Sequence, residues 1–237
     1  MFLLSNVFKF MFFARVMVLE FLRLAVVHDD WSRFTESIDA FVDVASSIPI
    51  AGTGVKRSIL VVSSPRLIEV KRLMGLVRGF RSVKSVGLVS RYAARNNVVA
   101  VLSTVRLFRG GVLSAVLNHG SYYYREFIQG GLEYWFVVTG DAGGLISELR
   151  EHADVKVIEH VDALDAARRI GKVSLTRREL DVLKATYDAG YFNWPRDYGV
   201  NFIAGRLGVS KTTLMQELRS VTRKLAEREL NRWDYLV

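Results

Sequence analysis

Residues 201–214 read NFIAGRLGVSKTTL, and this segment predicts two short helices joined by a tight turn. Ala204 is small enough to let a second helix pack closely, and Gly208 supplies the backbone freedom that a tight turn needs. Ser210 is a good N-cap for the helix that follows. This is the layout of a helix-turn-helix, so we expect the chain to bind duplex DNA.

The second helix of this motif is predicted over residues 211–226 and has one apolar side. At about 100° per residue, Leu214, Leu218, Val221 and Leu225 fall on that side and are expected to be buried. The opposite side is expected to meet DNA, with the first turn nearest the base edges. The predicted DNA-binding residues are Ser210, Lys211, Thr212, Thr213, Gln216, Arg219, Ser220 and Arg223. The alternative is an ordinary solvated helix face in a module that contacts protein.

Within this set the expected roles differ with position along the helix. Lys211, Thr212, Thr213 and Gln216 are the candidates for base edges, since glutamine can pair bidentately with adenine. Arg219 and Arg223 lie farther along and are expected to contact phosphate more than guanine.

A capped helix is predicted to precede the motif. Residues 175–180 read LTRREL, in which Thr176 and Glu179 have the spacing of a capping box. Leu180, Leu183 and Tyr187 would form its buried stripe, and Gly190 would end it in a left-handed conformation. Residues 191–197, YFNWPRD, are too aromatic for a plain linker. We interpret this segment as a clamp between the two helical parts, with Trp194 buried.

These segments resemble a known family. Residues 175–179 (LTRRE), 189–196 (AGYFNWPR) and the positions from Ile203 to Leu225 are similar to the bacterio-opsin-activator type helix-turn-helix domain of archaeal transcription regulators. The resemblance covers about residues 173–228 and is specific, because a plain helix-turn-helix does not require the Gly-Tyr-Phe-x-x-Pro-Arg segment. It implies DNA binding and transcriptional control by a domain that follows an N-terminal sensory or associated domain. Phe202 occupies a position that is commonly charged in relatives, which suggests a packing contact with the N-terminal domain or a partner.

Residues 20–160 alternate apolar runs with amphipathic stretches and predict an α+β domain. Helices are predicted at 31–45, 65–79 and 141–152, and the pairs Gly110-Gly111 and Gly130-Gly131 are interpreted as hairpin turns. Strands are predicted at 21–27, 58–63, 84–90, 98–105, 112–118, 122–129, 132–138 and 155–160. Helices alternate with strands first and hairpins follow, so we expect a mixed sheet of ferredoxin-like or regulatory type beside an all-α C-terminal domain.

The expected domains are an apolar leader or extra strand at 1–19, an α+β sensing or dimerisation domain at 20–160, a linker at 161–172 and a DNA-binding domain at 173–237. Lys9 and Arg15 interrupt the apolar start, so neither a spanning helix nor a signal peptide is expected there. Whether residues 1–16 belong to the native protein stays open. The chain has no cysteine, which excludes disulfides and thiolate chemistry and favours a cytoplasmic protein.

Positive charge is concentrated in one part of the chain. The net charge of the whole chain is +9, whereas residues 56–109 hold twelve basic residues and one acidic residue. Three interpretations remain: a solvated face, a second contact to DNA backbone, or a pocket for an anionic effector. Arg72, Arg78 and Arg81 are the candidates for the second contact or for anion binding.

No catalytic residue, metal ligand or cofactor is predicted. His28, His119, His152 and His160 lie far apart without metal-ligand spacing. Residues 140–144, GDAGG, join a strand to a helix but lack the Lys-Ser/Thr of a phosphate-binding loop, so a hairpin or helix cap is favoured. The aromatic runs at 122–124 and 134–136 are expected to fill a sheet core or a dimer interface in preference to a nucleic-acid surface.

The sequence therefore predicts a homodimeric, sequence-specific transcription regulator that binds double-stranded DNA and contacts no membrane. A small-molecule effector is possible, of unknown identity. Two alternatives stay open: a small-molecule-binding protein or enzyme with an accessory helix-turn-helix, and a non-specific nucleoid or RNA-binding protein.

Overall fold

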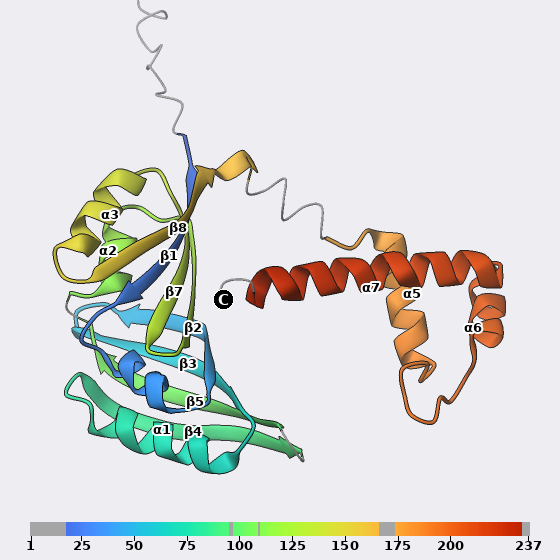
Figure 1. The fold of residues 1–237 in the computed structure, drawn as a ribbon, viewed down its shortest axis with the longest axis horizontal. Helices are drawn as coiled ribbons and strands as arrows, with labels where there is room; N and C mark the ends of the chain where they lie inside the picture. Colours follow the sequence, from blue (N-terminus) through green and yellow to red (C-terminus); the bar gives the residue numbers. More distant parts are fainter. Residues whose placement is uncertain (1–17, 95–96, 109, 166–173, 234–237) are drawn as a thin grey trace, which may run out of the picture. The chain divides into compact units, whose positions relative to one another are not determined.

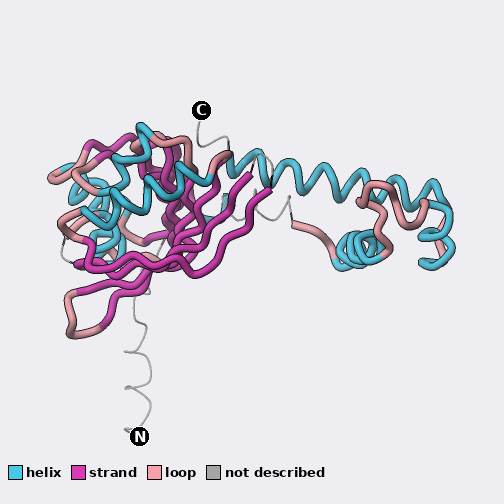
Figure 2. The backbone as a smooth tube through the Cα atoms, turned by 90° about the horizontal axis from the view of Figure 1, so that it is seen from below, coloured by secondary structure: helices cyan, strands magenta, loops and turns pink. Residues whose placement is uncertain are grey.

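A computed structural model describes residues 18–94, 97–108, 110–165 and 174–233. The chain divides into two compact units, residues 1–164 and 165–237. All the described strands lie in the first unit, and the second contains helices (Figures 1 and 2). Residues 1–17 of the predicted leader (1–19) and residues 166–172 of the predicted linker (161–172) lie outside the described residues, as does residue 173.

The described strands form one eight-stranded sheet in the order β4-β5-β3-β2-β6-β7-β1-β8. Its members are β1 (Glu20–Val27), β2 (Phe41–Ile50), β3 (Val55–Ser64), β4 (Val83–Ala94), β5 (Asn97–Leu107), β6 (Tyr123–Gln129), β7 (Leu132–Thr139) and β8 (Asp154–Asp162). The predicted α+β class is confirmed. Every pairing between these strands is antiparallel, so the parallel neighbours of a mixed sheet do not occur among them.

One half of the sheet has a ferredoxin-like arrangement. In chain order it runs β1, α2 (Val112–Asn118), β6, β7, α3 (Ala142–Arg150) and β8, and its spatial order β8-β1-β7-β6 is the 4-1-3-2 order of a split βαββαβ unit. Strands β2 to β5, together with α1 (Leu67–Gly79), are inserted between β1 and α2. The inserted strands extend the sheet from β6 outward.

The main core lies on one face of the sheet. The register places Leu24, Trp135, Glu126, Val44 and Leu60 opposite one another across successive strands, so they share a face. Toward β4 this face packs against α1 in one buried cluster, and toward β8 it packs against α2 and α3 in another. The two clusters meet near β6, where the residue on this face is the carboxylate Glu126.

Aromatic side chains pack together on the other face. The ring of Phe127 lies 5.6 Å from that of Phe41 and 5.7 Å from that of Phe136, measured between centroids. Tyr134, Trp135 and Phe136 are all buried, as expected for strand aromatics, whereas Tyr122 and Tyr123 are exposed. The run at 134–136 is therefore part of the sheet's packing on both faces.

Two predicted elements were wrong. Residues 31–45 are a short 3-10 helix, η2 (Trp31–Ser37), followed by β2, and residues 112–118 are the helix α2. The first error overlooked the period-2 alternation of β2, and the second arose because a short apolar run fits either structure. Gly130-Gly131 does form the hairpin between β6 and β7. Gly110-Gly111 instead leads into α2, with Gly111 at φ 91°.

No helix among the described residues is long and apolar enough to cross a membrane.

Candidate nucleic-acid interface

The second unit is built from α5 (Arg177–Asp188), α6 (Val200–Leu207) and α7 (Lys211–Trp233). Val182 and Ala189 from the α5 region, Ile203 and Ala204 from α6, and Leu214 and Leu218 from α7 form one buried cluster. The predicted seam of α7 is confirmed at Leu214, Leu218 and Val221, which are buried, and Leu225 is half-buried. Small Ala204 sits in this cluster as expected.

The turn between α6 and α7 has the predicted chemistry. Gly208 adopts φ 66°, in the left-handed region, and the amide of Val209 donates to the carbonyl of Ala204 at 3.0 Å. Ser210 caps α7, because its hydroxyl accepts from the amide of Thr213 at 3.0 Å. The hydroxyls of Ser210 and Thr213 also lie 2.8 Å apart. The start of α7 is therefore held in a fixed conformation.

A polar cluster around Glu179 joins α5 to α7. Glu179 completes the predicted capping box with Thr176, and its carboxylate accepts from Lys224 at 2.7 Å and from the Ser220 hydroxyl at 2.8 Å. The hydrogen bond from Lys224, followed by those from Thr176 and Ser220, lowers the pKa of Glu179 to about 2. Arg178 pairs with Glu217 beside this cluster. These contacts orient α7 against α5.

The predicted stripe on α5 was wrong. Leu180 and Tyr187 are 51% and 73% exposed, whereas Val182 and Thr186 are buried. The buried line follows Val182, Thr186 and Ala189, at i, i+4 and i+7, and Thr186 satisfies its hydroxyl by donating to the carbonyl of Val182 at 2.8 Å. A buried threonine bonded to its own helix was read from the sequence as a polar surface position. Gly190 ends the helix at φ 62°, as predicted.

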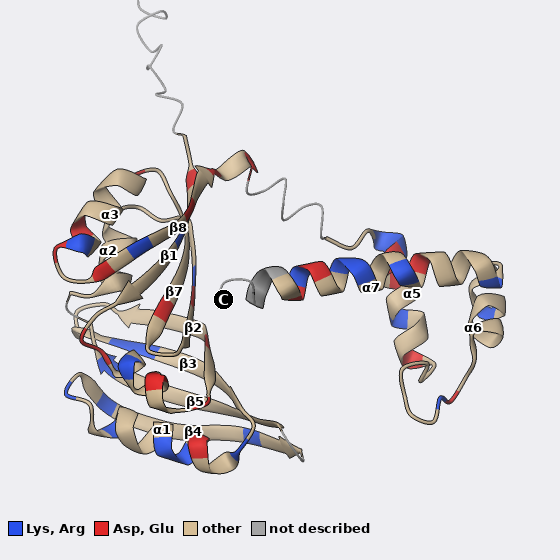
Figure 3. Cartoon of the chain, viewed as in Figure 1, with Lys and Arg blue, Asp and Glu red and all other residues tan. Residues whose placement is uncertain are grey.

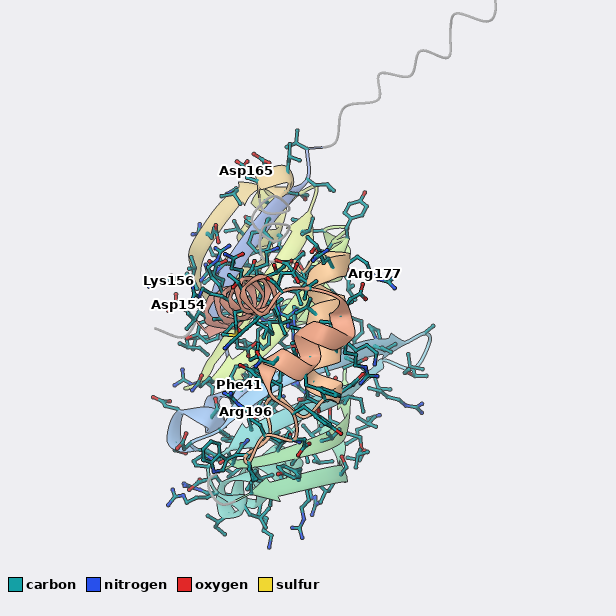
Figure 4. The ribbon with its side chains drawn as sticks, turned by 90° about the vertical axis from the view of Figure 1, so that its right-hand side faces the viewer. Phe41, Asp154, Lys156, Asp165, Arg177 and Arg196 are labelled. Carbon is teal, nitrogen blue, oxygen red and sulfur yellow. The ribbon has the colours of Figure 1, made fainter. Side chains whose placement is uncertain are left out.

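The aromatic loop between α5 and α6 does not bury Trp194. That side chain is 95% exposed, so its predicted role as a clamp is wrong. Tyr191 packs against the helical cluster, and the guanidinium of Arg196 lies over its ring at 4.5 Å from the centroid. Arg196 is labelled in Figure 4. Phe202 stacks on Tyr198, with ring centroids 4.2 Å apart, so this departure from the family pattern has a partner within the same unit.

The predicted DNA-binding residues differ in their exposure and in their partners. Lys211, Thr212, Gln216 and Arg219 are exposed and make no hydrogen bond or ion pair with any described residue, and we call them the reading face. Arg223 continues this line but pairs with Glu227 at 2.8 Å on the surface. Such exposed pairs are weak, so the guanidinium is readily released. Ser210 and Thr213 serve the cap.

Ser220 does not face outward. It is half-buried and its hydroxyl donates to Glu179, so we remove it from the predicted DNA contacts. At 100° per residue Ser220 lies with Glu217 and Lys224 on the flank of α7 that meets α5. Sequence reasoning also missed Arg206, an exposed cation in the last turn of α6 that pairs with no acidic residue in the described part of the chain. The absence of any acidic residue three or four positions away was a usable signal. Figure 3 shows cations along α6 and α7.

The basic segment of the first unit does not form a single surface. Arg72, Arg78 and Arg81 are exposed, but Arg72 donates to the carbonyl of Ser37 at 3.3 Å and Arg81 pairs with Asp29 at 2.5 Å. Arg106 is buried against Asp30. The charge surplus seen in the sequence is thus divided between the surface and the interior.

The histidines and the GDAGG turn have structural partners. Asp141 caps α3 by accepting from the amide of Gly144 at 3.0 Å, which confirms the cap, and it also contacts His119 at 2.7 Å. Burial lowers the pKa of His119, but its hydrogen bonds with Asp141 and Glu148 outweigh this effect, so the pKa is raised. His28 lies near Asp30 and Glu133, a grouping that the sequence spacing did not reveal.

That last grouping is already satisfied internally. Glu133 accepts from the Trp135 indole at 3.1 Å and lies 3.0 Å from His28. Asp30 accepts from the amide of Trp31 and from Arg106. A metal ion would have to displace these donors.

Comparison with known proteins agrees with this geometry. Residues 175–227 match the family described as "HTH DNA binding domain". These residues form a helix-turn-helix DNA-binding domain. The predicted bacterio-opsin-activator type is confirmed for this region.

The chain is also similar to a longer protein of Haloferax volcanii that is named "Putative transcriptional regulator". The two are 33% identical over 126 residues, which is 49% of this chain and 22% of that protein. The chain therefore spans about a fifth of the length of this relative.

Proposed function

We propose that the chain is a sequence-specific transcription regulator in which the start of α7 enters the major groove of DNA. The observation that carries the proposal is the reading face: four exposed side chains without partners among the described residues, on the first three turns of a capped helix. Charged and amide side chains at the start of such a helix contact base edges and phosphates. The name of the Haloferax relative supports the same role. We propose that this regulator is not an enzyme and that it acts in the cytoplasm.

The proposal is tested with a duplex selected from random sequence by the full-length protein. Gln216→Ala should cost about 1–3 kcal/mol at one base pair of the selected site and relax the preference there. Thr222→Ala, an exposed polar substitution on the flank of the same helix, is the matched control and should bind like wild type. Binding isotherms on the selected site and its single-base variants provide the readout. Equal discrimination by Gln216→Ala and wild type would remove Gln216 from base readout.

We further propose that the chain binds DNA as a homodimer. A single helix-turn-helix buries little surface, and symmetric readers contact half-sites about one helical turn apart. The selected duplex should therefore contain an inverted repeat, and two chains should bind per duplex in sedimentation experiments. A selected site with one half-site, bound by one chain, would contradict the dimer.

A non-specific nucleic-acid binder is the second candidate, supported by the net charge of +9. Competition decides between the two. Random duplex at equal concentration would displace such a binder, but it would leave a sequence-specific regulator on its selected site.

A further inference from the structure

A cavity of about 390 Å³ lies in the first unit. It opens on the helix-covered face of the sheet near β6, where the two buried clusters meet, and it extends to the glycines that lead into α2. Its volume is within the range of sites that bind small molecules. Its walls include Trp135, Phe80 and Leu113, and its polar lining includes Lys56, Arg106 and Glu126.

Most charges around the cavity are paired. Arg106 is bound to Asp30, Arg81 to Asp29 at 2.5 Å, and His28 to Glu133 at 3.0 Å. Two charged groups that line the cavity are left over.

Those groups are Glu126 and Lys56. Glu126 is 5% exposed and Lys56 is half-buried, and neither the carboxylate nor the ammonium group makes a hydrogen bond or ion pair with any residue that the structure describes, including each other. A buried charge without a partner is costly, and natural proteins pair such groups or use them. The cavity thus presents one acceptor and one donor that have no partner among the described residues.

The electrostatics agree with this geometry. Burial, reinforced by the charge of Glu133, raises the pKa of Glu126 to about 8, and burial lowers the pKa of Lys56. The groups are close enough for each to influence the other's pKa, yet no ion pair joins them. A ligand that bridged them would stabilise both charged forms.

We infer that this cavity binds a small zwitterion with an apolar body, namely a free amino acid with an apolar side chain. Its ammonium group would donate to Glu126, its carboxylate would accept from Lys56, and its side chain would contact Trp135 and Phe80. A cation alone would leave Lys56 unpaired, and an anion alone would leave Glu126 unpaired. The three existing pairs would stay intact.

Binding to this cavity does not require DNA. A role for the amino acid as an effector, however, rests on the proposed function, because its binding can alter transcription only if the chain is a transcription regulator. The experiments therefore measure binding and DNA affinity separately.

Binding is tested on the full chain by titration calorimetry and thermal melting with L-leucine and L-phenylalanine as probes. At least one probe should bind and raise the melting temperature. 4-Methylpentanoate, which lacks the ammonium group, and 3-methylbutylamine, which lacks the carboxylate, are matched to leucine and should bind at least ten-fold more weakly. No binding of apolar amino acids, or equal binding of a singly charged analogue, would overturn the inference.

The residues are tested by Glu126→Gln and Lys56→Met, which keep similar volumes and remove one unpaired ionisable group each. Both variants should melt no lower than wild type without ligand, and each should lose the stabilisation by the amino acid. Glu148→Gln, a carboxyl change at the half-buried pair with His119 and outside the cavity lining, is the control, and its melting temperature should respond to the amino acid as that of wild type does. If Glu126→Gln and Lys56→Met both bind the probe as wild type does, the cavity is not the site. Titration calorimetry measures binding of the amino acid directly, so it can be used even if one variant has a lower melting temperature. The other variant then provides an independent test of the cavity.

DNA affinity is measured on the selected duplex with and without the bound probe. Loss of probe binding with intact DNA binding contradicts this inference alone. Failure of DNA binding with intact probe binding contradicts the proposed regulator and leaves the cavity assignment standing. A change in DNA affinity that Glu126→Gln abolishes supports the amino acid as effector, and an unchanged affinity overturns that role.

Discussion

Single residues in the DNA-binding domain differ sharply in what they contribute to stability. Trp194 is the largest side chain in the aromatic loop but is almost fully exposed, whereas Leu214 is fully buried among α5, α6 and α7. Trp194→Ala should therefore change the free energy of unfolding by less than about 0.5 kcal/mol. Leu214→Ala should reduce it by about 2–5 kcal/mol, because it opens a cavity in a small core. Chemical denaturation of the full chain, followed by helical signal, compares the two. A large loss from Trp194→Ala would mean that the loop packs against something.

Glu126 should make stability depend on pH in a defined direction. Its folded pKa of about 8 lies above its usual value, so between about pH 4.5 and 8 the folded state holds a proton that the unfolded state has released. Stability from this group is therefore lost as pH rises through that window. Since one pKa unit corresponds to about 1.4 kcal/mol, Glu126→Gln should gain at least about that much relative to wild type between pH 5 and 8. The difference between the two melting curves isolates this group from His28, whose pKa is also raised. Parallel curves across the window would show that Glu126 is already ionised.

At the scale of elements, the contact between α5 and α7 depends on Glu179. The lowered pKa means that its stabilising effect is present above about pH 4.5 and is lost as pH falls toward 2. Glu179→Gln should lower the melting temperature at neutral pH, since it weakens the bond to Lys224 and the capping box. The gap between variant and wild type should close in acid. Asp181→Gln, which alters an exposed surface pair, is the control. A gap that persists at pH 2 would indicate lost packing instead of lost charge.

Local signals in the sequence predicted the elements of this domain well. Gly208, Ser210 and the Thr176–Glu179 box act through neighbours within four residues, and the structure has each of them as expected. The buried face of α5 could not be predicted in the same way. Which side of a helix is buried depends on where its partner helix lies. Thr186 can be buried because its hydroxyl donates to the carbonyl of Val182, one turn earlier in the same helix. Ser220 was misplaced because its partner, Glu179, lies 41 residues earlier in the chain.

The cavity was beyond sequence reasoning for a related reason. Its charged groups come from the loop after β1, from the turn between α1 and β4, and from strands β3, β5, β6 and β7. They meet only because the register across the sheet brings them to one face. Lys56 and Arg106 were counted in the basic segment, for which a solvated face, a DNA contact and a pocket all stayed open, and both line this cavity. A count of charge along a chain does not report which side of a strand each residue occupies.

At the scale of the whole molecule, the salt dependence of DNA binding measures how many cations contact phosphate. Each such contact adds about 0.9 to the magnitude of the slope of log affinity against log salt. Replacing Arg206, Lys211 and Arg219 with alanine should flatten the slope by up to about 2.7. Lys184→Ala, an exposed cation paired on α5, is the control. An unchanged slope in the triple variant would contradict the orientation of α7 proposed above.

The same measurement tests the basic segment of the first unit. If it contacts DNA backbone, neutralising Arg72, Arg78 and Arg81 should flatten the slope by up to about 2.7 and leave base preference intact. If the slope does not change, these arginines form a solvated face, in agreement with the contacts that Arg72 and Arg81 already make within the unit.

The insertion of β2 to β5 after β1 sets the order in which the first unit can fold during synthesis. β1 pairs with β7 and β8, and Leu22 lies opposite Val137. The backbone hydrogen bonds of β1 therefore cannot form until β7 has been synthesised. Strands β2 to β5 and α1 are contiguous in the chain and can close among themselves as soon as they leave the ribosome. Until β7 has been synthesised, both edges of the apolar strand β1 are unpaired, and unpaired strand edges can pair with other chains. β1 precedes the other described strands in the chain but is among the last of them to be paired, so nascent chains are most exposed to aggregation between the synthesis of β1 and that of β8.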